Sequence, residues 1–194
     1  MAEMLAGPDN APSPDMLEVY NQWGQGNWGA VLTGNVQVDI NHLGTPFDPA
    51  LSTYTHKENN SSLIAAWSKY ATACQQHGTP AIVQIVHPGR QSPRVAGKRG
   101  IFASSIAPSA LPLRIGDGWF ECFVSSVVFP GPREMSADEV RGVVGQFVDA
   151  ARVMADSGFS GVELHGAHGY LIDQFLNPKV PFTHSPNMAD CMAC

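Results

Sequence analysis

The sequence predicts an α/β protein built on a parallel sheet. Three short segments are nearly continuous in apolar residues, and a helical pattern precedes each one. Such strands are buried on both faces, which is typical of parallel sheets with helical crossovers. Gly34 and Asn35, then Gln84 and His87, then His165 follow at the carboxyl ends of these strands. Both a doubly wound sheet and a (β/α)₈ barrel place their chemistry at that edge, so this pattern alone leaves both open.

The first helix is predicted over residues 13–26. Ser13 is a suitable N-cap, and Pro14 suits the first helical position because its missing N–H is not needed there. Apolar residues at helical spacing continue the pattern until the glycines at its end. A strand over residues 28–38 follows.

Two more helix and strand pairs follow the same plan. A helix over residues 61–78 places its apolar residues on one face, and a strand over 80–87 comes next. The third helix opens with a capping box, in which Ser136 and Glu139 satisfy backbone donors reciprocally. A strand over 160–165 follows that helix.

A long connection separates the second and third of these strands. Between Val86 and Met135 the chain is rich in Pro and Gly and shows no clear helical period. A loop of this length in a compact domain is usually functional or contains small strands of its own. Within it, "WFECFVSSVVF" (119–129) is interpreted as one arm of a β-hairpin.

Composition narrows the class of protein. The 194 residues carry 11 basic and 17 acidic side chains, a net charge of −6. This balance argues against nucleic acid or an anionic membrane as the main partner. No apolar run approaches the roughly 18 residues of a membrane span, and no signal peptide is recognised, so a cytoplasmic protein is expected. The "CMAC" at 191–194 lacks a second ligand pair and is interpreted as a tail with two thiols.

Three proton-carrying side chains, His165, His168 and Tyr170, follow the last predicted strand. They could be partly buried structural histidines at a strand end. They could be part of a metal site, although HxxH supplies two ligands and no third stands at a recognisable spacing. They could also form a clamp, in which imidazole N–H groups bind a substrate oxygen and a phenol delivers a proton.

A resemblance favours the clamp. "SGFSGVELHGAHGYLIDQFLNP" (157–178) resembles the signature of the old yellow enzyme, or NADH:flavin oxidoreductase, family. "GAVLTGNVQVD", "AIVQIVHPGRQ" and "IAPSALP…PREMSADEV" resemble further segments of that family in the right order, and together they cover nearly all of residues 1–178. The resemblance implies a flavin-binding (β/α)₈ barrel that reduces activated C=C bonds with FMN and NAD(P)H.

The resemblance also implies roles for the cofactor-binding residues. Gln84 matches the glutamine whose amide binds the polar edge of the flavin. Gly34 matches a residue beside the flavin, where a side chain would obstruct the ring. Ala2 stands where the family usually has Thr or Cys near the flavin C4 oxygen, and alanine cannot make that hydrogen bond.

The implied catalytic residues are the three that follow the last strand. His165 and His168 match the pair that binds the carbonyl oxygen of an α,β-unsaturated substrate and makes its β-carbon electrophilic. Tyr170 matches the acid that protonates the α-carbon. No metal is implied, and the expected partner is a small enone substrate.

The chain is shorter than the roughly 250 residues of a (β/α)₈ barrel. The expected fold is therefore an incomplete barrel with roughly its first four strands, and a long loop or hairpin insertion after the third. Residues 1–178 form this part, "MAEMLA" (1–6) ends its first strand, and residues 179–194 form a divergent tail. Open barrel edges predict self-association.

Two alternative functions remain open. One is a truncated, catalytically inactive homologue that lacks the FMN phosphate site, since that site lies after the seventh and eighth strands of such barrels. The other is a metal-dependent hydrolase that uses His165 and His168, which the absence of a carboxylate ligand cluster in the sequence disfavours.

Overall fold

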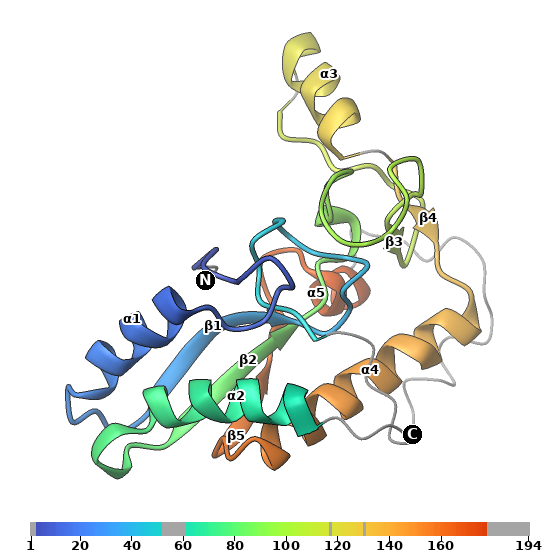
Figure 1. The fold of residues 1–194 in the computed structure, drawn as a ribbon. Coiled ribbons are helices and arrows are strands. Elements are labelled where there is room, and N and C mark those ends of the chain that lie inside the picture. The colour runs from blue at the N-terminus through green and yellow to red at the C-terminus, as the bar shows by residue number, and fades with distance from the viewer. Residues whose placement is uncertain (1–2, 52–60, 117, 130, 178–194) are drawn as a thin grey trace.

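A computed structural model describes residues 3–51, 61–116, 118–129 and 131–177 (Figure 1). Three helix and strand pairs form its main body, and they follow the order that the sequence predicts. They are α1 (Pro14–Gly24) and β1 (Val31–Gln37), α2 (Ser61–Cys74) and β2 (Ala81–Val86), and α4 (Ala137–Asp156) and β5 (Gly161–Leu164).

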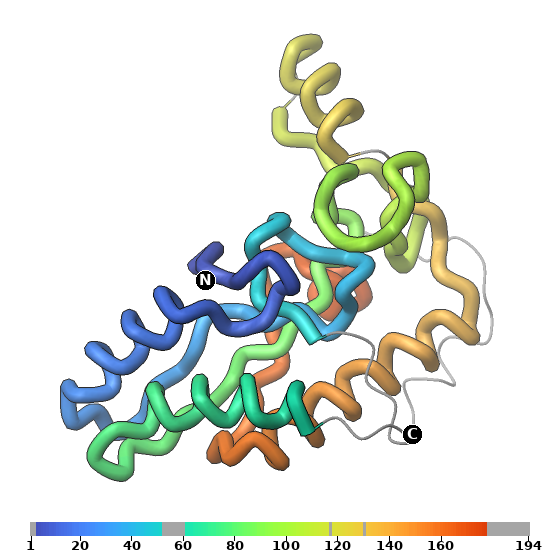
Figure 2. Tube along the Cα trace, viewed as in Figure 1, coloured from blue at the N-terminus to red at the C-terminus, as the bar shows by residue number. Residues whose placement is uncertain are grey.

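The three strands form one parallel sheet in the order β1-β2-β5. The trace in Figure 2 shows the helices running alongside the sheet, and the main core lies between them. A buried aromatic cluster forms its centre, in which Tyr70 packs edge-on against Tyr20 and Phe159. The parallel sheet with helical crossovers, predicted from the sequence, is confirmed.

The predicted helix starts are also confirmed. The Ser13 side chain accepts a hydrogen bond from the backbone N–H of Met16 at 3.1 Å, with Pro14 as the first helical residue. At α4 the capping box is complete, because Ser136 and Glu139 each accept a bond from the other's backbone N–H. Local side-chain chemistry fixes these boundaries, so the sequence reveals them without tertiary information.

The predicted hairpin arm at 119–129 is wrong, because this segment forms helix α3 (Trp119–Val128), which protrudes from the body in Figure 1. Its aromatic and β-branched residues favour a strand, but a strand needs a neighbour to pair with. Here the loop instead bonds to the C-terminal half of a helix: the Arg94 N–H donates to the Val128 carbonyl at 2.9 Å. The Ser125 hydroxyl accepts the Ile115 N–H at 3.0 Å.

Short elements complete the described chain. They are the 3₁₀ turns η1 (Gln76–Gly78) and η2 (Gly89–Gln91), the paired two-residue strands β3 (Ile106–Ala107) and β4 (Arg133–Glu134), and helix α5 (Leu171–Leu176). The main sheet has three strands within the described residues. Residues 3–6, expected to end a further strand, contribute only an isolated bridge between Ala6 and Pro12. The expected tail at 179–194 lies outside the described residues.

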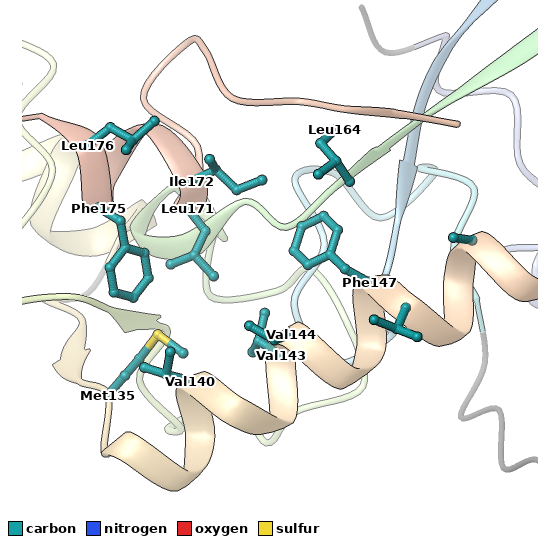
Figure 3. A pocket seen from close by; sticks show the side chains of 12 residues that line it. Met135, Val140, Val143, Val144, Phe147, Leu164, Leu171, Ile172, Phe175 and Leu176 are labelled. Atoms are coloured by element: carbon teal, nitrogen blue, oxygen red, sulfur yellow. The ribbon is translucent and has the colours of Figure 1, made fainter. Parts of the chain in front are cut away.

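An apolar groove of about 440 Å³ opens beside α4 (Figure 3). It lies between α4, α5 and the end of β5, and its lining includes Val144, Phe147, Leu164, Phe175 and Leu176. Three of these side chains are more than half exposed: Val144 at 58%, Leu164 at 56% and Leu176 at 62%. The apolar residues of α4 therefore face two surroundings, the core and this open groove. Within the described residues, no helix is long and apolar enough to cross a membrane.

Candidate functional site

A row of three polar side chains crosses the sheet near its carboxyl end. Asn35 on β1 is in register with Gln84 on β2, and Gln84 is in register with Glu163 on β5. Residues of one row on parallel strands point to the same face, and here Val36, Val83 and Val162 alternate onto the helix-covered face. The row therefore lies on the face of the sheet opposite the helices, which is the inner face of a barrel.

Hydrogen bonds orient two members of this row. The Gln84 Nε2 donates to Glu163 Oε2 at 2.7 Å. This bond ties the Gln84 amide on β2 to the Glu163 carboxylate on β5. The Asn35 Oδ1 is buried and accepts no hydrogen bond in the structure. Since a buried acceptor without a partner is costly, the row favours a ligand with an N–H donor.

The catalytic candidates lie one step further along the same strand end. His165 is buried, and its backbone N–H continues the sheet by donating to the Ile85 carbonyl at 3.0 Å. His168 and Tyr170 follow in the turn before α5. The ring centroid of His165 lies 5.0 Å from that of His168 and 4.9 Å from that of Tyr170. The structure thus brings all three residues together, as the sequence predicts.

The two imidazoles contact each other directly, with His168 Nδ1 3.1 Å from His165 Nε2. One ring donates and the other accepts, so the pair uses one of its two N–H groups internally when both rings are neutral. Burial, followed by the charge of His168 when protonated, lowers the pKa of His165. A neutral pair in this geometry offers one outward donor. Two donors to one carbonyl need either a separation of the rings or a proton taken up by the pair.

Tyr170 is partly buried, which raises the pKa of its phenol, and the nearby Asp48 carboxylate adds to this effect. A raised pKa keeps the proton on the phenol oxygen at neutral pH. The phenol of Tyr170 therefore carries its proton in this environment, which is the state that a proton-donor role requires.

Gly34 has a role that the sequence interpretation did not foresee. A Cβ at this position would lie 2.0 Å from Glu3 Oε2, so the Glu3 carboxylate packs directly on the glycine. The Tyr20 hydroxyl donates to Glu3 and accepts the Gly34 N–H at 2.7 Å. The missing side chain of Gly34 therefore makes room for Glu3. Ala2 lies outside the described residues.

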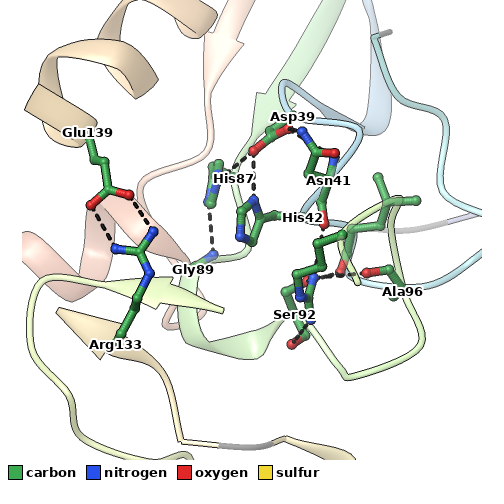
Figure 4. Close-up of polar contacts among 11 residues, drawn as sticks. Asp39, Asn41, His42, His87, Gly89, Ser92, Ala96, Arg133 and Glu139 are labelled. Atoms are coloured by element: carbon green, nitrogen blue, oxygen red, sulfur yellow. Dashed lines mark hydrogen bonds and ion pairs between the residues drawn. The ribbon is translucent and has the colours of Figure 1, made fainter. Parts of the chain in front are cut away.

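A second polar cluster, Asp39, His42 and His87, follows the ends of β1 and β2 (Figure 4). His42 Nδ1 lies 2.7 Å from Asp39 Oδ2, and His87 Nε2 lies 3.8 Å from it. Burial alone would raise the pKa of Asp39, but the hydrogen bond with His42 and the nearby His87 imidazole hold it well below its usual range. These are the only three metal-ligating side chains that group closely within the described residues.

The hydrogen-bond polarity of this second cluster argues against a metal. His87 Nδ1 accepts the backbone N–H of Gly89 at 3.1 Å, so the proton of neutral His87 is on Nε2. A metal ligand needs a lone pair on that nitrogen. The cluster is therefore a network in which the Asp39 carboxylate faces two imidazole N–H groups. Within the described residues, His165 and His168 belong to no group of three such ligands.

Sequence reasoning missed the polar partners of the site. Glu163 sits inside the quoted signature without an assigned role, yet it orients Gln84. Gln91 and Gln174 brace the turn that holds His168, through bonds to the carbonyls of His168 and Gly169. Alternation along β5 could have indicated Glu163, since it shares a face with His165. The two glutamines act across loops, and no local spacing reveals them.

The comparisons with known proteins agree with this geometry. The model of the NADH:flavin oxidoreductase / NADH oxidase family matches residues 1–181. NADH-dependent flavin oxidoreductase iliE of Neonectria sp. is 46% identical over 178 residues, which are 92% of this chain and 23% of that protein. The 12-oxophytodienoate reductase 2 of Arabidopsis thaliana is 33% identical over 172 residues, 88% of this chain and 42% of that protein.

Solved structures show the same relation. The old yellow enzyme homologue from Zymomonas mobilis superposes with a TM-score of 0.75 at 25% identity, over 95% of this chain and 48% of that one. TcOYE superposes with a TM-score of 0.75 at 26% identity, over 96% and 50%. The chain thus spans half or less of the length of these relatives, which agrees with the expected partial barrel. It belongs to the NADH:flavin oxidoreductase / NADH oxidase family.

Proposed function

We propose that this chain contributes the substrate side of an FMN-dependent site that reduces the C=C bond of α,β-unsaturated carbonyl compounds with NAD(P)H. The observation that supports this most is the convergence of His165, His168 and Tyr170 at the end of β5, one strand from Gln84. A hydrogen-bonding pair that binds the carbonyl oxygen and a protonated phenol are the groups that reduction of the conjugated C=C bond needs.

The residues present fit the polar edge of a flavin. That edge has one N–H donor between two carbonyl acceptors. The buried Asn35 Oδ1 lacks a donor among the described residues, so it can accept an N–H at this row, beside the Gln84 amide that is in register with Asn35. When bound and reduced by NAD(P)H, FMN would supply the hydride that adds to the β-carbon of the substrate. The phosphate site of such barrels lies after the seventh and eighth strands, beyond the three that the main sheet shows here.

The chain's own residues then act on the substrate. An outward N–H of the imidazole pair binds the carbonyl oxygen and draws electron density from the conjugated bond. The negative charge that develops on that oxygen strengthens this hydrogen bond, so the contact stabilises the transition state more than the ground state. Tyr170 holds the proton that the α-carbon receives, because burial keeps its phenol protonated.

A kinetic comparison of variants tests these roles with NADH, FMN and 2-cyclohexen-1-one. Replacing both His165 and His168 with Ala should raise KM and lower kcat while flavin binding persists. Tyr170→Phe should slow enone reduction and leave flavin reduction by NAD(P)H largely intact. His77→Asn is a matched control, since His77 is exposed and lies before the amino end of β2, whereas the site lies at the carboxyl ends of the strands. Unchanged turnover in the double variant would refute the clamp.

A catalytically inactive homologue is the second candidate. The Glu3 carboxylate occupies the space beside Gly34, where the proposed flavin ring would need access. If the chain binds no FMN, and Glu3→Ala does not create binding, this second candidate replaces the first.

We also propose that residues 1–178 form the family portion and residues 179–194 a separate tail. A chain that ends at Pro178 should then match the 194-residue chain in FMN binding and in its free energy of unfolding.

A further inference from the structure

His168 has an unusual backbone conformation for its residue type. Its φ is +58°, in the left-handed region that residues with a Cβ rarely adopt, and Gly169 follows with φ of +71°. Such a conformation persists only where surrounding groups hold it. The hydrogen bonds around this turn therefore determine where the imidazole of His168 lies.

Three side-chain bonds hold the turn. The Gln91 Nε2 donates to the His168 carbonyl at 2.7 Å. Asp173 Oδ2 accepts the Gly169 N–H at 2.7 Å, and Gln174 Nε2 donates to the Gly169 carbonyl at 2.7 Å. Asp173 and Gln174 belong to α5, which follows the turn in sequence, whereas Gln91 comes from η2, a separate loop after β2.

The bond from Gln91 positions His168 relative to the rest of the site. It links the loop after β2 to the carbonyl of His168, the residue whose imidazole contacts His165. The approach is close, because a Cβ on Gly169 would lie 2.8 Å from Gln91 Nε2. A glycine at 169 and an amide donor at 91 thus form one fitted contact. Gln174 is buried, so its loss would disturb packing as well as the turn, whereas Gln91 is only partly buried.

We infer that Gln91 is a positioning residue for the imidazole pair: its amide holds the His168 carbonyl, and with it the ring, against His165. Its amide binds the backbone carbonyl of His168, so it acts through the backbone of the turn. The effect of Gln91 on enone reduction rests on the proposed function, whereas the effect of Gln91 on the imidazole geometry does not.

The test replaces the donor and keeps the length of the side chain. Gln91→Met removes the N–H, and Gln91→Glu places an acceptor opposite the His168 carbonyl. The matched control is Gln75→Met, because Gln75 Nε2 makes a similar bond to the Gly158 carbonyl at 2.9 Å, away from the site. Circular dichroism checks that each variant folds, and either Gln91 variant alone suffices for the comparison.

The first readout is the ¹⁵N chemical shift of the imidazole nitrogens in the flavin-free chain of 194 residues, assigned by His165→Asn and His168→Asn. We expect the wild-type shifts to report the contact between His168 Nδ1 and His165 Nε2. In the Gln91 variants the His168 shifts should move toward those of His165→Asn, in which this contact is absent, and in Gln75→Met they should not. Shifts identical to wild type in a folded Gln91 variant would overturn the inference.

The second readout separates this inference from the proposed function. With FMN and 2-cyclohexen-1-one, Gln91→Met should raise KM about tenfold with a smaller change in kcat, since the substrate oxygen loses a preset partner. If no variant binds FMN, the proposed function fails, and the imidazole shifts alone still decide the role of Gln91. An unchanged KM in an active enzyme would count against it.

Discussion

Gln174→Met provides a quantitative test of how the site is held together. The Gln174 side chain is 1% exposed. Its Nε2 donates to the carbonyls of Gly169 at 2.7 Å and Pro88 at 3.2 Å, and its Oε1 accepts the Arg90 N–H at 3.3 Å. Methionine has nearly the same length and fills the same space, but it satisfies none of these three backbone groups.

The expected loss follows from these bonds. Each of the three bonds contributes about 1 kcal/mol net. The bonds to the Gly169 carbonyl and from the Arg90 N–H are only partly buried, so water can reach these backbone groups in the variant. Because the third bond is long, we expect a loss of about 2–3 kcal/mol in the free energy of unfolding. For a chain of this size, about 2–4 °C per kcal/mol predicts a fall in Tm of about 4–12 °C.

Urea unfolding followed by far-UV circular dichroism measures this loss. Gln75→Met is the matched control, because its amide bond is exposed to solvent and its removal should cost less than about 0.5 kcal/mol. Equal losses of unfolding free energy in the two variants would refute the reasoning. They would show that the buried Gln174 amide does not hold the turn at His168 against the loop after β2.

Three further predictions concern α4 and the groove. Ser136→Ala should lower the free energy of unfolding by about 1 kcal/mol, measured in urea, because α4 loses its N-cap. Hydrogen bonds from Arg133 and from the Ser136 backbone lower the pKa of Glu139 to about 2. The stabilisation from Glu139 should therefore be full above pH 4.5 and lost as the pH falls toward 2. The free energies of unfolding of wild type and Glu139→Gln should converge at that low pH. A difference between them that does not change with pH would contradict this. The sequence predicts self-association through open barrel edges, and the exposed apolar groove is a further uncovered surface. Val144→Glu places a charge in this groove, so it should reduce self-association measured by sedimentation velocity. A wild-type chain that stays monomeric at all concentrations would contradict this expectation.

Features fixed by local chemistry were predictable from the sequence. The starts of α1 and α4 depend on Ser13 and Ser136, whose side chains bond backbone groups three residues away. The signature residues His165, His168 and Tyr170 were predicted to lie together, because they follow one strand closely enough that the turn must gather them.

Features that depend on distant partners were not predictable in the same way. Helix α3 has the composition of a strand, and its helical state depends on contacts with Arg94 and Ile115 in the surrounding loop. The need for a residue without a side chain at position 34 depends on Glu3, whose carboxylate packs on Gly34 from the N-terminal segment. The brace at His168 joins Gln91 to a residue 77 positions later. In each case a tertiary contact, rather than a spacing along the chain, decides the outcome.

The most direct test of the account is an FMN titration of residues 1–194, followed by the quenching of flavin fluorescence. We expect saturable, near-stoichiometric binding by the wild-type chain, weaker binding by Gln84→Met, and wild-type binding by Gln75→Met, because Gln84 belongs to the polar row and Gln75 does not. A folded chain that leaves flavin fluorescence unchanged at every protein concentration would contradict the account.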